Sequence, residues 1–154
     1  MGTSFLGRFD YSIDAKGRVN IPAKFRKGLN PEAEETFVIC RAPCSCLRAY
    51  PMDKWKKRQA ELDALAETPE GLKLKRHTYG TLSESTLDAQ GRVSLTQVQM
   101  KLAEITKEVT LVGEGDYVEI WDTEKFNKYI GLEPEDDGFD DAHFNIVKSE
   151  MEKK

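Results

Sequence analysis

An Asp and an Arg four residues apart occur twice in this chain, each time around a glycine. The two copies read Asp14-Ala15-Lys16-Gly17-Arg18 and Asp88-Ala89-Gln90-Gly91-Arg92. A carboxylate can orient a guanidinium through charge-assisted hydrogen bonds, and glycine supplies the positive φ that a tight turn needs. Three uses of such a turn stay open: an ion pair that only fixes the turn, a catalytic pair, or an arginine held ready for nucleic acid.

The catalytic interpretation has little support in the sequence. One carboxylate and one guanidinium, without an accompanying histidine, nucleophile or metal cluster, make a poor active site. The sequence contains no Walker motif, no dinucleotide-binding fingerprint and no Gly-x-Ser-x-Gly motif. We therefore expect no enzymatic activity and no cofactor.

The chain has three cysteines, Cys40, Cys44 and Cys46. An odd number argues against a disulfide scaffold, and the Cys-x-Cys pair lacks the second ligand pair that zinc sites usually have. We expect no metal site. The simplest interpretation has Cys40 packed within a strand and the other two cysteines at a turn.

The charge is unevenly distributed along the chain. The net charge is −4, which argues against a nucleic-acid-binding protein, but residues 8–27 carry six basic and two acidic residues. Clusters of this kind contact phosphates, and arginine can also read guanine edges. The candidate DNA contacts are Lys16, Arg18, Lys24 and Arg26, with Asp14 and Gly17 supporting the turn.

The two Asp-to-Arg motifs belong to a longer internal repeat. Residues 12–21 match residues 86–95 at an offset of 74, and residues 37–50 resemble residues 109–121 at an offset of 71 to 72. Two copies are too few for a solenoid, so we expect a pseudo-two-fold arrangement in which each half buries the apolar face of the other. Phe9, Tyr11 and Ile13 alternate with polar residues, which is typical of a half-buried strand.

Each half is predicted to run strand, turn, strand, short helix, strand pair and helix. In the first half the short helix follows Pro22 and ends near Gly28, and a longer helix begins near Asp53. The second half is predicted to have a strand over residues 79–87, a helix over 97–103, strands over 109–112 and 117–121, and a helix over 123–129. A connecting helix is predicted over residues 69–77.

These elements give four segments: a first repeat over residues 7–53, a helical connection over 54–82, a second repeat over 83–126, and a tail over 127–154. The tail opens with a crowded acidic run, which favours a flexible segment, although its later apolar spacing also allows a short docking helix. No apolar run is long enough to span a membrane, and the N-terminus does not read as a secretory signal. We expect a cytoplasmic protein.

The chain resembles the MraZ family of bacterial transcriptional regulators, which have two SpoVT/AbrB-type halves. The resemblance covers about residues 5–131 and rests on the two Asp-to-Arg motifs with their flanks, on residues 50–55 (Tyr-Pro-Met-Asp-Lys-Trp), on residues 108–113, and on residues 119–122 (Glu-Ile-Trp-Asp).

The resemblance implies a mainly β fold with short helices, namely a pseudo-two-fold AbrB-like swapped-hairpin β-barrel. It also implies a ring-shaped homo-oligomer that binds double-stranded DNA at short direct repeats upstream of the cell-division and cell-wall gene cluster, associated with the nucleoid. The family's DNA contacts map to Lys16 and Arg18. The alternative is a ring-forming scaffold protein without specific DNA binding.

The second motif departs from the first in ways that bear on its role. Gln90 replaces the lysine, Thr96 replaces the proline, and the following helix lacks the basic residues of the first copy. Because its surroundings are acidic, we expect Asp88, Gly91 and Arg92 to have a structural or subunit-interface role instead of a DNA role.

Overall fold

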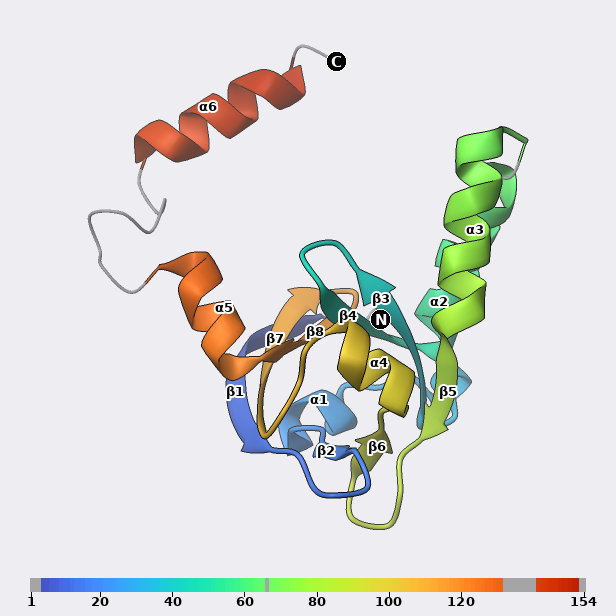
Figure 1. The fold of residues 1–154 in the computed structure, drawn as a ribbon, viewed down its shortest axis with the longest axis vertical. Helices are drawn as coiled ribbons and strands as arrows, with labels where there is room; N and C mark the ends of the chain where they lie inside the picture. Colours follow the sequence, from blue (N-terminus) through green and yellow to red (C-terminus); the bar gives the residue numbers. More distant parts are fainter. Residues whose placement is uncertain (1–3, 66, 132–140, 153–154) are drawn as a thin grey trace. The chain divides into compact units, whose positions relative to one another are not determined.

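The computed structural model describes residues 4–65, 67–131 and 141–152 and divides into two units, residues 1–122 and 123–154 (Figure 1). The first unit combines antiparallel β-sheet with several helices. The expectation of a mainly β fold with short helices is therefore wrong in one respect, because two of the helices are 14 and 13 residues long. The acidic run of the tail at residues 133–140 lies outside the described residues.

The larger sheet has six antiparallel strands in the order β1-β7-β8-β4-β3-β5. Its strands are β1 (Phe5–Ser12), β3 (Thr36–Ala42), β4 (Cys46–Pro51), β5 (Ser83–Thr86), β7 (Glu108–Gly115) and β8 (Val118–Asp122). The first strand of each repeat pairs with the other repeat: β1 pairs with β7, and β5 pairs with β3. The predicted two-repeat organisation is confirmed in this interleaved pairing.

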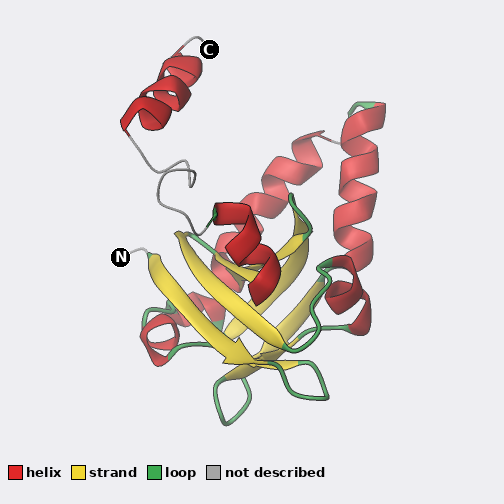
Figure 2. Ribbon diagram, turned by 60° about the vertical axis from the view of Figure 1, so that its left-hand side comes forward, coloured by secondary structure: helices red, strands yellow, loops and turns green. Residues whose placement is uncertain are grey.

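A closed barrel is not shown by this pairing. The six-stranded sheet ends at β1 and β5, and a separate two-stranded sheet pairs β2 (Arg18–Asn20) with β6 (Arg92–Ser94). Figure 2 shows the curved strands and the two loops that project side by side beyond them.

Pairs of equivalent residues lie on the pseudo-two-fold axis. In the small sheet Val19 lies opposite Val93, its counterpart at an offset of 74. In the large sheet Arg48 lies opposite Glu119, its counterpart at an offset of 71. The sequence repeat is therefore a structural repeat whose halves meet at matching residues.

A short helix follows each strand of the small sheet: α1 (Ala23–Lys27) after β2 and α4 (Gln97–Leu102) after β6. Pro22 lies at the N-cap of α1 and Gly28 at its C-cap, close to the predicted ends. α4 begins with a capping box in which Thr96 and Gln99 satisfy each other's backbone N–H groups. A 3₁₀ turn, η1 (Pro31–Ala33), leads into β3.

The connection between the repeats is a helical hairpin of α2 (Met52–Leu65) and α3 (Pro69–Thr81). The predicted strand over residues 79–87 is wrong at its start, because α3 continues to Thr81 and β5 begins only at Ser83. Tyr79 packs edge-on against Trp55 of α2, and its hydroxyl donates to Asp63 at 3.1 Å. These contacts with α2 keep Tyr79 helical despite its high β-propensity.

Two apolar clusters stabilise the first unit. The larger one lies between the sheets and includes Phe5, Phe25, Val19 and Val93. The smaller one joins the helical hairpin to the sheet through Val38, Tyr50, Trp55 and Leu62. Trp55 and Leu62 of α2 are thus core residues, whereas Leu65 of the same helix is exposed.

The hairpin between β3 and β4 corrects one expectation about the cysteines. Cys40 is buried within β3, as predicted, and Cys44 is exposed in the turn. Cys46 does not lie in the turn: it begins β4, is 1% exposed, and its thiol contacts the carbonyl of Pro43 at 3.4 Å. Similarly, Tyr117 lies in the turn before β8 and not in the strand.

The second unit contains α5 (Thr123–Ile130) and α6 (Asp141–Glu152). Part of the tail is therefore helical, as its apolar spacing allowed. The apolar side chains Phe144, Ile146, Val147 and Met151 of α6 are exposed, so docking of this helix stays a prediction. Among the described residues, no helix is long and apolar enough to cross a membrane.

Candidate nucleic-acid interface

The first Asp-to-Arg turn is held by a single carboxylate. One oxygen of Asp14 accepts hydrogen bonds from the backbone N–H groups of Lys16 (3.0 Å) and Arg18 (2.8 Å), and the other accepts from Arg18 Nε at 2.6 Å. These bonds lower the pKa of Asp14 below its usual value, with the backbone N–H of Arg18 as the largest cause. The carboxylate is thus fully engaged in fixing the arginine.

The second turn repeats the same geometry. Asp88 accepts from the backbone N–H groups of Gln90 and Arg92 and from Arg92 Nε, each at 2.9 Å. Its pKa is lowered as well, chiefly by the backbone hydrogen bond from Arg92. Gly17 and Gly91 have φ values of +78° and +76°, which glycine adopts without strain. The ion pair therefore forms in both copies, through Nε of each arginine.

Backbone hydrogen bonds to the carbonyl groups of Gly17 and Gly91 join the two turns. The N–H of Ile21 donates to the carbonyl of Gly91 at 3.0 Å, and the N–H of Leu95 donates to the carbonyl of Gly17 at 2.8 Å. Arg92 Nη1 also lies 3.7 Å from the carboxylate of Asp14. The structure therefore brings both motifs, far apart in sequence, to one end of the first unit (Figures 1 and 2).

Arg26 crosses from the first repeat to the second turn. Its Nε donates to the carbonyl of Ile21 at 2.9 Å, and a Cβ at Gly91 would lie 2.7 Å from its guanidinium carbon. Met100, the counterpart of Arg26 at an offset of 74, has the same relation to Gly17, with its sulfur at 3.2 Å. Arg26 thus brings positive charge to the second turn, where the counterparts of Lys24 and Arg26 in α4 are the uncharged Val98 and Met100.

The remaining predicted residues are solvent-exposed. Lys16 lies at the tip of the first turn and Lys24 on α1, and neither forms an ion pair with any residue in the described ranges. The side chain of Arg18 is 33% exposed and that of Arg92 is 22% exposed. Sequence reasoning missed the reach of Arg26 to Gly91, because only the pairing of β2 with β6 brings the two segments together.

The two turns and α1 bring several basic side chains together on this surface. Its carboxylates are engaged in the turns, and its outward groups are guanidinium and ammonium donors, which suit phosphates and the edges of bases. Within the described ranges, no group of three or more His, Cys, Asp or Glu side chains is arranged to hold a metal ion.

A protein-family model with the description “MraZ protein, putative antitoxin-like” matches residues 4–76 and 79–143. The two matched stretches correspond to the two repeats and together cover most of the sequence. The chain belongs to the MraZ family.

Proposed function

We propose that this protein is a sequence-specific DNA-binding transcriptional regulator that contacts DNA through its first Asp-to-Arg turn, which the second turn supports. The observation that carries the proposal is the presence of two rigid, glycine-tipped turns side by side, each with an arginine fixed by a carboxylate. The family description, with its antitoxin-like wording, supports a regulatory role.

Arg18 is the proposed base-contacting residue. Asp14 holds its Nε and backbone N–H, so little rotamer entropy is lost when the outer guanidinium nitrogens meet a guanine edge. Lys16, Lys24 and Arg26 supply phosphate contacts around it. Asp14 orients the arginine and does not touch DNA.

The second motif has a supporting role in this proposal. Arg92 is less exposed than Arg18 and faces both Asp88 and Asp14, so its charge serves to join the turns. This agrees with the acidic character of the second half and with the structural role expected from the sequence.

We infer that the protein acts as a ring-shaped homo-oligomer of AbrB-like swapped-hairpin barrels, associated with the nucleoid. The interleaved strands β1 and β5 support the barrel. A chain of net charge −4 binds DNA weakly on its own. The first turns of several subunits must therefore bind successive direct repeats at the same time, and this avidity supplies the affinity. The regulated genes are proposed to be those of the cell-division and cell-wall cluster.

Mobility-shift titrations at several salt concentrations test this function. The protein should prefer the DNA upstream of its own gene over random DNA of equal length, and its affinity should fall steeply as salt rises. If the protein forms rings but shows no preference at moderate salt, the proposal fails and the scaffold alternative replaces it.

A further inference from the structure

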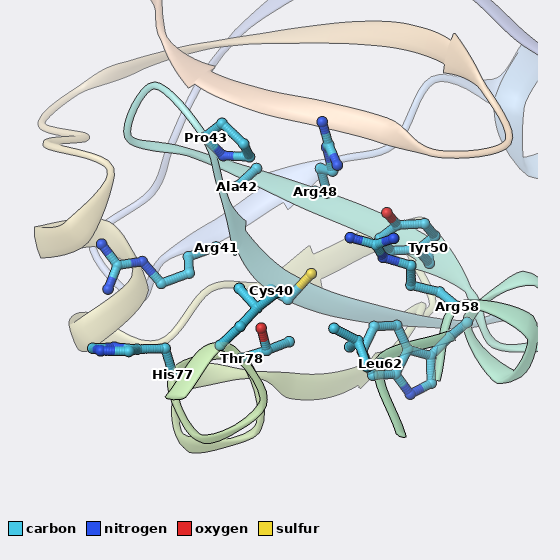
Figure 3. A pocket seen from close by; sticks show the side chains of 12 residues that line it. Cys40, Arg41, Ala42, Pro43, Arg48, Tyr50, Arg58, Leu62, His77 and Thr78 are labelled. Carbon is cyan, nitrogen blue, oxygen red and sulfur yellow. The ribbon is translucent and has the colours of Figure 1, made fainter. Parts of the chain in front are cut away.

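A cavity of about 550 Å³ lies between the strand pair β3–β4 and the helical hairpin α2–α3 (Figure 3). Sites for small organic ligands usually measure roughly 300–1,000 Å³. None of the residues assigned above to the DNA-binding turns lines this cavity. It therefore represents a separate feature of the fold.

The inner wall of the cavity is apolar. Trp55 and Leu62 of α2 are 5% and 2% exposed, and Leu74 of α3 adds a further aliphatic side chain. Cys40 and Thr78 form the wall between the two helices and the sheet, as Figure 3 shows. A flat aromatic or short aliphatic group would find apolar contacts here.

The polar lining of the cavity is positively charged. Its cationic side chains are Arg41, Arg48 and Arg58, His77 adds an imidazole, and no aspartate or glutamate is among the described residues that line it. Arg58 lies beside Tyr50 on one side of the cavity, and Arg41 and His77 lie on the other (Figure 3). The side chains of Arg41 and His77 extend away from Arg58 (Figure 3), so the anion contact is assigned to the Arg58 side of the cavity.

The carboxylates nearest to these arginines neutralise them only in part. Arg48 Nε lies 3.3 Å from Glu119, and Arg58 Nη1 lies 3.3 Å from Glu61. The Arg58–Glu61 pair is solvent-exposed and hence weak, and a guanidinium has further N–H donors beyond one such contact. Arg58 is the lining residue best suited to exchange its partner for a ligand.

The buried thiol of Cys40 is not an anionic partner for these arginines. Burial raises its pKa to about 11, although the positive charges of Arg48 and Arg58 act in the opposite direction. The thiol is therefore neutral at physiological pH.

We propose that this cavity binds a small amphipathic oxyanion, with a carboxylate or phosphate group at Arg58 and an aromatic or aliphatic body against Trp55 and Leu62. The proposal concerns binding alone and does not depend on the DNA-binding function.

Isothermal titration calorimetry of the full chain with 1-naphthyl phosphate tests the proposal. We expect saturable binding of one molecule per chain, at least about tenfold tighter than that of inorganic phosphate or neutral 1-naphthol, because each lacks one half of the recognised chemistry. A parallel titration with 1-naphthoate identifies which oxyanion is preferred, and tight binding of either one supports the proposal.

The variant Arg58→Gln should weaken binding of the better oxyanion by about tenfold or more. Arg76→Gln is the matched control: it removes the same charge from α3 at a position that does not line the cavity, and it should change affinity less than twofold. Absence of saturable binding, equal affinity for inorganic phosphate, or unchanged binding in Arg58→Gln would each overturn the proposal.

Discussion

The guanidinium of Arg92 lies 3.7 Å from the carboxylate of Asp14, which is the same carboxylate that fixes Arg18. The two motifs are separated by 74 residues in sequence, yet they share this ionic contact. The two turns are therefore one structural unit, and a substitution in one turn is expected to alter the contacts of the other.

Arg92→Ala should affect stability more than DNA affinity. The change removes the contacts of Arg92 with Asp88 and Asp14 but leaves the hydrogen bonds between Asp14 and Arg18 intact. We expect the melting temperature to fall by roughly 1–3 °C and the affinity for upstream DNA to change less than about threefold. Thermal unfolding and fluorescence anisotropy measure the two effects, and a large loss of affinity with no loss of stability would refute this ranking.

Gly17→Ala should destabilise the protein more than Gly91→Ala. Each alanine would adopt a positive φ, which costs about 1 kcal/mol. At Gly17 the new Cβ would also lie 2.7 Å from the backbone carbonyl of Leu95, whereas at Gly91 it would meet the movable end of Arg26. Denaturant unfolding should separate the two variants by at least about 1 kcal/mol.

A double-mutant cycle checks the role of Arg26 in this difference. In an Arg26→Ala background Gly91→Ala should lower the free energy of unfolding by less than it does in wild type. Gly17→Ala should lower it by the same amount in both backgrounds, because its Cβ clashes with the backbone oxygen of Leu95. Equal effects of Gly17→Ala and Gly91→Ala in the wild-type background would contradict the packing described here.

Gln99→Leu should destabilise the protein by about 2–4 kcal/mol. Gln99 is completely buried, and the two N–H groups of its amide are shared among three acceptors within hydrogen-bonding distance, the carbonyls of Ile39 and Thr81 and the hydroxyl of Ser83. Leucine would leave these acceptors without their buried donor. Gln97→Leu, at an exposed position in the same helix, is the control and should change the unfolding free energy by less than about 0.5 kcal/mol.

The turn carboxylates make stability depend on pH at the acidic end. The pKa of Asp88 in the folded state lies below its usual value of 3.8, so the ionised group stabilises the fold above that value and the stabilisation is lost as the pH falls through the folded-state pKa. Asp88→Asn should lower the melting temperature at pH 7, and the difference from wild type should shrink below about pH 4.

Glu32→Gln serves as the control for this experiment, since Glu32 is exposed in η1 and outside both turns. The melting temperature of Glu32→Gln should stay close to that of wild type at every pH measured. A difference in melting temperature between Asp88→Asn and wild type that grows towards low pH would contradict the stabilising role of the ionised Asp88.

The sequence alone predicted the features that depend on local rules. Asp14 and Gly17 fix a tight turn through backbone geometry, and the repeat offset of 74 indicated that Val19 and Val93 would be related. These predictions succeeded because an Asp-Gly turn is determined within a few residues, and because a two-fold repeat makes equivalent residues meet at its axis.

The features that depend on tertiary contacts could not be predicted in this way. Residues 79–81 were expected in a strand, but packing of Tyr79 on Trp55 keeps them helical. Likewise, Gln99 corresponds to the buried Phe25 of the first repeat, and only the neighbouring carbonyls of the folded sheet explain why an amide occupies that place. The motif Thr96-x-x-Gln99 could have signalled the helix cap, but not the burial.

Arg18 is the residue on which the DNA-binding proposal depends most. Its replacement by alanine leaves the second turn in place, together with the backbone hydrogen bonds that join the two turns at Gly17 and Gly91. Assembly measured by size-exclusion chromatography with light scattering should therefore be unchanged. Lys73→Ala, an exposed charge change on α3, is the matched control and should behave like wild type in assembly and in DNA binding.

The most direct test is fluorescence anisotropy of wild type and Arg18→Ala with upstream DNA and with a scrambled duplex of the same length, at one moderate salt concentration. Wild type should prefer the upstream DNA by about tenfold or more, and Arg18→Ala should lose that preference while its weak binding to both duplexes becomes nearly equal. If Arg18→Ala keeps the full preference, or if the wild type shows none, the account of this protein as a sequence-specific DNA-binding regulator is wrong.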